Sequence, residues 1–132
     1  MNLTTKSEYA LLALFYLAKH KDEFVNIDDI VNYYELPKKY LEKILAILKQ
    51  SRYVKTRRGP SGGYKIFKKP EKISLAEIIR LMDGALSPTE SVSKYFYTET
   101  PLSREKKFLD IMQNIRDYIS NKLEKTTLKD LM

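Results

Sequence analysis

The chain has 132 residues, 43% of them hydrophobic and 31% charged, a composition typical of one folded domain and too apolar for general disorder. It contains no cysteine and one histidine, His20, which excludes disulfides, cysteine-ligated metal sites and a cysteine nucleophile. The longest apolar run, residues 9–18, is flanked by charge, so we expect neither a membrane span nor a signal peptide. The starting expectation is a cytoplasmic binding protein.

Apolar residues at helical spacing predict three helices in the first part of the chain. Thr5 and Glu8 have the spacing of a capping box ahead of the first helix. Asn26 is expected to cap the second helix, and Pro37 to be the first residue of the third. The predicted helices are residues 5–20, 27–34 and 37–50, and residues 24–25 are expected to be extended.

A β-hairpin is predicted next, because two segments rich in strand formers flank a loop that holds three of the four glycines. Ser74 and Glu77 then predict a capped helix that ends near Met82. The following segment lacks periodicity and is expected to be loop, before a long last helix and a final turn capped by Thr127. The predicted ranges are strands 53–56 and 64–67, helix 75–82, loop 85–102 and helix 103–124.

The positive charge of the chain is concentrated in one segment. The chain carries 24 Lys and Arg against 17 Asp and Glu, a net charge of +7. Residues 38–69 hold eleven basic residues and one acid, Glu42, whereas residues 1–37 are net negative and residues 70–132 balance. A localised basic segment favours a polyanionic partner, since each phosphate contact releases condensed counterions. The alternative is a solvated, lysine-rich face.

The order of the predicted elements is that of a winged helix-turn-helix domain. We expect a mainly α fold with a small β-hairpin wing and a long C-terminal dimerisation helix. The third helix begins with cationic and phenolic side chains, where a recognition helix meets the major groove of double-stranded DNA. The glycines of the wing let the backbone approach a phosphate or a narrow minor groove. The predicted DNA-binding residues are Lys38, Lys39, Tyr40, Glu42, Lys43, Arg57, Arg58 and Gly59.

Four short motifs resemble one family of bacterial regulators. They are Leu3-Thr4-x-Lys6-x-x-Tyr9-Ala10, Tyr40-Leu41-Glu42-Lys43, Arg58-Gly59-Pro60-x-Gly62-Gly63-Tyr64 and Thr127-Leu128-x-Asp130-Leu131. These motifs look like those of the Rrf-type, IscR- and CymR-like winged helix-turn-helix transcriptional regulators. The resemblance implies a sequence-specific repressor that acts as a homodimer on a partly palindromic operator. It also implies that Pro37 and the predicted residues of the third helix from Lys39 onward face the groove, and that Arg58 is the wing arginine.

The sequence departs from the family pattern in its DNA-binding half. Pro37 and Lys39 stand where some members carry small hydroxyl residues, so the base preference is not transferable. Arg52 stands where many members have glycine. If its backbone is left-handed, this residue costs about 1 kcal/mol, so either the turn differs from that of those members or the cost is accepted for one more phosphate contact.

The largest departure lies in residues 85–103, where cluster-binding relatives place three cysteines and this chain has none. The resemblance is therefore to a cysteine-free branch, for which we expect no metal or other cofactor. A small-molecule or protein effector is expected in its place. The residues found there are Ser91, Ser93, Tyr95, Phe96 and Tyr97, and the aromatic ones either line an effector pocket or pack the loop onto the domain.

One apolar stripe on the last helix is long for a small domain to cover. We interpret it as a dimer interface, with intrachain core as the alternative. The predicted interface residues are Phe108, Ile111, Met112, Ile115, Tyr118 and Ile119. The expected organisation is a DNA-binding domain in residues 1–84, a linking loop in residues 85–102 and a dimerisation helix with its tail in residues 103–132.

Other classes of function remain as alternatives. An enzyme is disfavoured, because the chain lacks a recognisable nucleophile, metal set or phosphate loop. A winged-helix module that binds protein or RNA would explain the fold but not the basic segment. Within the DNA-binding reading, Glu42 either accepts from a cytosine amine or orients a neighbouring lysine. Tyr40 is expected to lie partly in the hydrophobic core and partly against DNA. His20 is assigned to no site.

Overall fold

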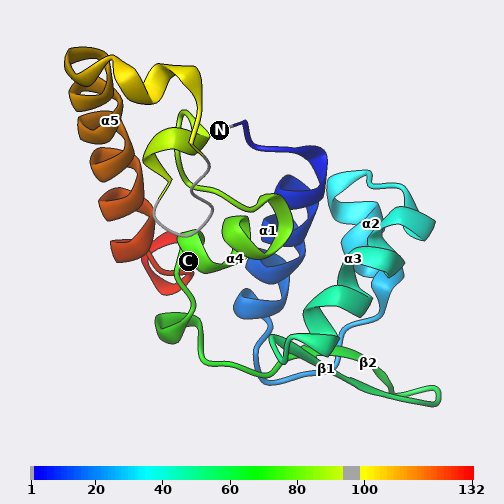
Figure 1. The fold of residues 1–132 in the computed structure, drawn as a ribbon. Helices are drawn as coiled ribbons and strands as arrows, with labels where there is room; N and C mark the ends of the chain where they lie inside the picture. The colour runs from blue at the N-terminus through cyan, green and yellow to red at the C-terminus, as the bar shows by residue number, and fades with distance from the viewer. Residues whose placement is uncertain (1, 94–98) are drawn as a thin grey trace.

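The fold is mainly helical with one β-hairpin, as the sequence predicts. The computed structural model describes residues 2–93 and 99–132. Figure 1 shows α5 at one end of the molecule, α1 and α4 in the middle, and α2, α3 and the hairpin at the other end. The α-helices are α1 (Thr5–Lys19), α2 (Ile27–Tyr34), α3 (Lys38–Gln50), α4 (Leu75–Asp83) and α5 (Lys106–Lys125), and the strands are β1 (Val54–Arg57) and β2 (Gly63–Ile66). The described 3-10 turns are η1 (Pro70–Lys72), η2 (Glu90–Val92), η3 (Pro101–Arg104) and η4 (Lys129–Leu131).

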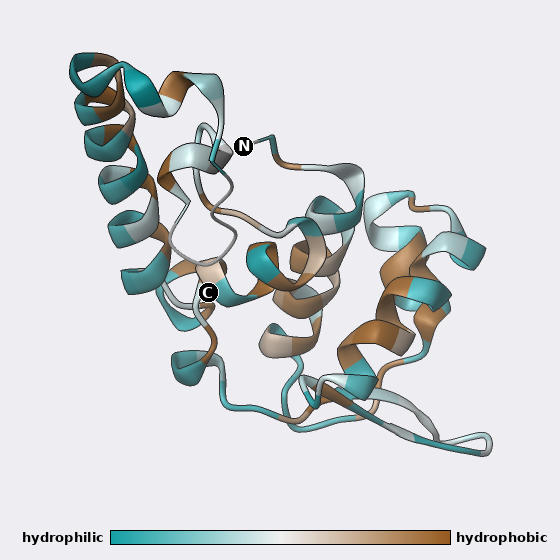
Figure 2. Cartoon of the chain, viewed as in Figure 1, coloured by the Kyte–Doolittle hydropathy of each residue, from teal (hydrophilic) through white to brown (hydrophobic). Residues whose placement is uncertain are grey.

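Helix α1 is the centre of the hydrophobic core. It packs against α3, α4 and β2, and Leu14 and Leu17 have no exposed surface. Complete burial of each such leucine contributes roughly 1.5–3 kcal/mol. Figure 2 shows brown residues on α1 and α3, whereas α5 carries teal and brown residues in alternation. The core therefore supports the helix-turn-helix directly, and α5 lies at its margin.

Helix α1 begins at Thr5 as predicted, but its cap differs from the sequence prediction, and so does the start of α5. The cap of α1 is Thr4 rather than Thr5: its side chain accepts from the Ser7 N–H at 3.3 Å and donates to Asp83 on α4. Helix α5 begins at Lys106 rather than residue 103, because η3 occupies the preceding residues and Ser103 Oγ accepts from the Thr100 N–H at 3.1 Å. The cap of α1 is thus reinforced by a residue distant in the sequence, whereas the turn ahead of α5 is closed by a contact over three residues.

The C-terminal tail returns to the beginning of α4. The Leu75 N–H donates to the Thr126 carbonyl and the Leu128 N–H to the Ile73 carbonyl, each at 2.9 Å. Leu128 is completely buried. The predicted turn after Thr127 is present, since the Thr127 N–H donates to the Asp130 carboxylate at 2.9 Å. The tail thus belongs to the same hydrophobic core as α1.

Candidate nucleic-acid interface

Helices α2 and α3 form the helix-turn-helix. Asn26 caps α2 as predicted, with its side-chain oxygen accepting from the Asp28 N–H at 2.8 Å. Glu35 ends α2 in the left-handed conformation, at φ 57°, and buried Leu36 anchors the turn. Pro37 is extended and is the N-cap of α3, so the helix begins at Lys38, one residue later than predicted. The turn fixes where the amino end of α3 emerges from the core.

One face of α3 is core and the opposite face is exposed. Leu41 and Leu45 are completely buried. The predicted contact residues on this helix, Lys38, Lys39, Tyr40, Glu42 and Lys43, are all exposed. The Lys38 ammonium lies 2.9 Å from the Asp28 carboxylate at the start of α2, and this hydrogen bond and charge raise the pKa of Lys38. Lys39 and Lys43 lie near the middle of the exposed face, since they follow the 100° helical period away from the buried leucines.

Tyr40 is shared between packing and solvent. Its ring meets the Tyr9 ring edge-on, with centroids 5.6 Å apart and planes at 87°, while 39% of the residue stays exposed. Aromatic pairs of this geometry contribute about 0.5–1.5 kcal/mol beyond area burial. The contact joins the amino end of α3 to α1, so the phenol is held in place with its outer edge available.

The hairpin is a wing that is attached to the core by its second strand. Val54 pairs with Ile66 and Arg57 with Gly63, one residue away from the predicted strand limits. Tyr64 on β2 also forms an isolated bridge with Val25, with hydrogen bonds of 2.7 and 2.8 Å. The segment predicted to be extended, residues 24–25, therefore lies beside β2 and pairs with it at Val25.

The two wing arginines differ in their surroundings. Arg57 donates to the Ser61 carbonyl at 2.6 Å, and its guanidinium lies 4.2 Å from the centroid of the Phe24 ring. Arg58 is exposed and makes no ion pair with any residue that the structure describes. The predicted pair thus divides into Arg57, which closes the wing loop, and Arg58, which is open to a ligand. Phe24 was predicted only as part of an extended segment, and no sequence pattern indicated its contact with Arg57.

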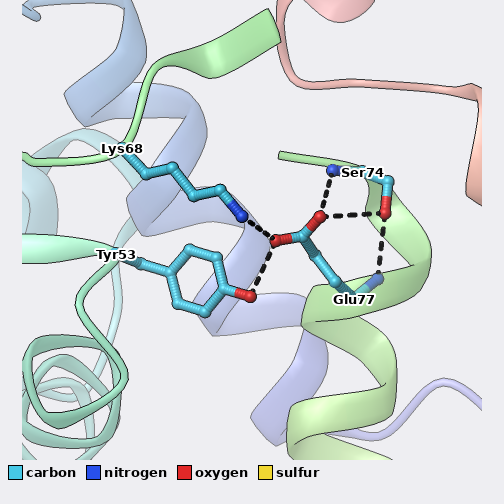
Figure 3. A network of polar contacts seen from close by, with 4 residues as sticks. All are labelled: Tyr53, Lys68, Ser74 and Glu77. Atoms are coloured by element: carbon cyan, nitrogen blue, oxygen red, sulfur yellow. Dashed lines mark hydrogen bonds and ion pairs between the residues drawn. The ribbon is translucent and has the colours of Figure 1, made fainter. Parts of the chain in front are cut away.

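The base of the wing is tied to α4 through Glu77. The Glu77 carboxylate accepts from the Tyr53 hydroxyl at 2.7 Å, the Lys68 ammonium at 2.9 Å and the Ser74 N–H at 3.0 Å (Figure 3). Burial alone would raise the pKa of Glu77, but these hydrogen bonds together lower it. Burial and the Glu77 contact raise the pKa of Tyr53. The predicted capping box is confirmed, whereas the links to Tyr53 and Lys68 could not be read from spacing.

Arg52 has the backbone conformation that favours glycine. Its φ is 66°, and its N–H donates to the Lys49 carbonyl at 3.0 Å as the chain leaves α3. The turn is therefore left-handed, the conformation in which a residue with a Cβ carries a conformational cost. The arginine is retained there at a cost of about 1 kcal/mol.

The predicted dimer residues lie on two sides of α5. Phe108, Ile111, Ile115 and Tyr118 are exposed, Ile111 by 56% and Tyr118 by 73%. Ile119 packs against the core, and Met112 is half-buried. The helix therefore uses one side for its own chain and leaves an apolar stripe of four residues uncovered.

Comparison with known proteins identifies the family. A profile of the Rrf2 family, described as an iron-dependent transcriptional regulator, matches residues 3–132. The chain belongs to the Rrf2 family. The HTH-type transcriptional regulator CymR of Bacillus subtilis (strain 168) is 33% identical over 132 residues, covering 99% of this chain and 89% of its own length. NsrR of the same strain, also an HTH-type transcriptional regulator, is 31% identical and covers 100% of this chain and 90% of its own.

Solved structures agree with this membership. The structure of CymR (YrzC), the global cysteine regulator of B. subtilis, aligns with a TM-score of 0.80 at 31% identity, covering 99% of this chain and 95% of that one. T. potens IscR aligns with a TM-score of 0.71 at 26% identity, covering 99% of this chain and 85% of that one. This Rrf2 chain is a DNA-binding transcription regulator with a winged-helix fold, which confirms the sequence prediction. Among its described helices, none has the length and apolar content that a bilayer crossing requires.

The Rrf2 family is described as iron-dependent, and the side chains able to ligate a metal show whether this chain fits an iron site. Protein iron sites use thiolates, imidazoles and carboxylates. Cysteine is absent from the sequence, and the ring of His20, the one histidine, stacks on Tyr16 with Nδ1 2.8 Å from the Tyr16 carbonyl oxygen. No cluster of three potential ligands occurs among residues 2–93 and 99–132. The residues present do not fit an iron or iron–sulfur site.

Of the predicted linking segment, residues 85–102, the structure describes residues 85–93 and 99–102. Ser91 and Ser93 are buried, and Arg116 of α5 donates to the Val92 carbonyl at 2.9 Å. Residues 95–97, the predicted aromatic cluster, lie outside the described residues. The described part of the loop is therefore held against α5 through its backbone.

Proposed function

We propose that this chain binds duplex DNA as a homodimer on a two-fold symmetric operator. The observation that carries this proposal is the exposed basic surface of α3 and the wing. The predicted DNA-binding residues of that surface are all exposed, and the buried leucines of α3 face the other way. Two recognition helices related by a two-fold axis would read half-sites about one helical turn apart, roughly 34–36 Å.

In this proposal, the wing and α3 have separate tasks. Arg58 enters a groove beside the half-site, while Arg57 holds the wing loop through Ser61 and Phe24. Lys39 and Lys43 contact phosphates. Glu42 accepts from a cytosine amine or orients a lysine beside it, a choice that base-specific binding data decide.

The exposed stripe of α5 is the proposed dimer interface. Phe108, Ile111, Ile115 and Tyr118 form one apolar strip on the helix, whose other side already packs on the core. Contiguous apolar surface of this kind commonly marks an interaction site. Residues 1–84 would then bind DNA and residues 103–132 would join the two copies. An effector would act by binding the DNA-competent and incompetent states with different affinities.

Selection from random duplex DNA with purified protein tests the proposal. The expected result is an enriched sequence with two-fold symmetry, protected as two half-sites in a footprint, and a dimer in sedimentation. Equal affinity for random duplexes, or preference for RNA, would contradict it and favour the winged-helix interaction module.

Arg58→Ala tests the wing within the same assay. If Arg58 reads a base edge or a narrow minor groove, operator binding weakens by about 1–3 kcal/mol and the preference at one position relaxes. Arg104→Ala is the matched control, since Arg104 is an exposed arginine in η3, far along the chain from the wing. Equal effects of the two variants would remove the wing from the mechanism.

A further inference from the structure

A groove lies where α3 ends and the hairpin begins, outside the predicted contact residues. It has a volume of about 470 Å³ and is lined by Lys49, Arg52, Val54, Lys55, Thr56 and Phe67. Three of these six residues are cationic, one is an exposed aromatic, and none is acidic. The groove therefore combines positive charge with an apolar wall and has no internal carboxylate to balance the charge.

The cations of the groove have no acidic partner in the described part of the chain, where all four ion pairs involve other residues. Lys38 and Lys68, from the same basic segment, are paired with Asp28 and Glu77. The Lys55 ammonium instead lies 5.6 Å from the centroid of the Phe67 ring, whose residue is 58% exposed. A cation held over an aromatic ring keeps its charge available and loses less freedom on binding an anion.

The backbone of Arg52 gives a second, independent observation. The chain turns out of α3 through a left-handed residue, a position where glycine is free of strain. An arginine at this position sets a guanidinium against the groove despite the strain. A residue that is unfavourable for folding and directed to a binding surface points to a ligand.

The position of the groove indicates which anion it takes. Lys49 lies two helical turns after Glu42, so the groove continues the edge of α3 that carries predicted contacts. Lys55 precedes Arg57 and Arg58 along the same strand and loop. The site is an open groove and not an enclosed pocket, as suits a chain that passes across it rather than a small ligand enclosed on all sides.

We propose that this groove binds backbone phosphates of the DNA that flanks each half-site. The inference rests on the proposed function, because it extends the same interface beyond the recognition helix and wing tip. Lys49, Arg52 and Lys55 supply the charge, and Phe67 holds Lys55 in position. The contact adds affinity on every sequence alike, since phosphates carry no base information.

A triple variant, Lys49→Gln with Arg52→Gly and Lys55→Gln, tests the groove. Each lost phosphate contact lowers the slope of log affinity against log salt by about 0.9. Because the dimer loses every contact twice, one lost contact per protomer lowers the slope by about 1.8. Lys72→Gln with Lys125→Gln and Lys129→Gln removes the same charge from exposed residues outside the groove and is the control.

A series of duplexes trimmed from the ends locates the contact. Wild-type protein should lose affinity when the flanks are removed, whereas the triple variant should bind long and trimmed duplexes equally and keep the base preference. Arg52→Gly alone should bind DNA more weakly while melting a few degrees higher, a combination that a purely structural role of Arg52 would not produce.

Three results would overturn the inference. The triple variant could match the control in salt slope and length dependence while both bind the operator, which refutes the groove and leaves the proposed function intact. The triple variant could lose base preference, which would make the groove a base reader. Inorganic phosphate or a mononucleotide could saturate the groove of wild-type protein without any dependence on flank length, which would assign the site to a free ligand. A wild-type protein that selects no operator would instead refute the proposed function itself.

Discussion

One attachment of the wing to the core, the Val25–Tyr64 bridge, requires the glycine beside it, and Gly63→Ala measures the strength of that attachment. Gly63 has φ 140°, and a Cβ added there would lie 2.3 Å from the Val25 carbonyl oxygen. The Val25–Tyr64 bridge carries two hydrogen bonds at this point, of 2.7 and 2.8 Å. An alanine must therefore adopt a backbone conformation that L residues avoid, and must also push the wing away from Val25.

The expected magnitude has two parts. The unfavourable φ costs about 1–3 kcal/mol. Separation of the bridge costs about 1 kcal/mol for each of two hydrogen bonds. The free energy of unfolding should therefore fall by about 3–5 kcal/mol, a large share of the 5–15 kcal/mol of a typical domain. Gly59→Ala is the matched control, because Gly59 has φ 97° but no atom within 4 Å of an added Cβ, and only the strain should appear.

Urea unfolding of the two variants and wild type, followed by far-ultraviolet circular dichroism, gives the comparison. Gly63→Ala should be less stable than Gly59→Ala by about 2 kcal/mol, the share assigned to the bridge. Equal losses of stability in the two variants would refute the reasoning, since they would mean that the Val25–Tyr64 bridge contributes nothing to the free energy of unfolding. A loss confined to Gly59→Ala would refute it as well.

Three further predictions concern the dimer, pH and metal. Ile115→Asp places a charge in the exposed stripe of α5 and should give a monomer in sedimentation; an intact dimer would place the interface elsewhere. Burial alone would raise the pKa of Asp83, but the hydrogen bonds from Thr4 and the charge of Lys6 lower it below the ordinary 3.8. The stability that the Asp83 carboxylate contributes is complete above its pKa in the unfolded chain and is lost as pH falls through its lower pKa in the folded chain. Asp83→Asn should therefore flatten the decline of the melting temperature below about pH 4. An unchanged decline would contradict this. Chelator and thiol oxidant should leave operator binding unchanged, because the chain has no thiolate; stoichiometric iron in anaerobically purified protein would contradict this.

Local sequence signals predicted those parts of the fold that local contacts decide. Asn26 and the Ser74–Glu77 pair cap their helices in the structure, since the cap and its partner lie within three residues. Helix α1 begins at Thr5 as predicted, but its cap is Thr4 rather than Thr5, and Thr4 also donates to Asp83, seventy-nine positions away. No spacing rule reaches that far.

The candidate site shows the same limit. Charge and the wing motif identified Arg57 and Arg58 together, because composition cannot distinguish two adjacent arginines. The structure separates them through Phe24 and Ser61, a ring and a carbonyl that become neighbours only when residues 24–25 join the sheet. The sequence left the backbone conformation of Arg52 open, and the folded chain was needed to show both its left-handed turn and the groove that it lines.

Helix α4 connects the proposed DNA-binding surface to the helix proposed to form the dimer. Along it, Glu77 holds the wing base through Tyr53 and Lys68, Arg80 binds Glu124 of α5, and Asp83 binds the start of α1. Part-exposed ion pairs of this kind add little stability, about 0–1 kcal/mol each, so their main effect is on position. The nine residues of α4 include no proline or glycine, the common causes of a helix kink. The distance from wing to α5 is therefore set within one protomer, and two-fold pairing of α5 would carry it over to the spacing between the two wings.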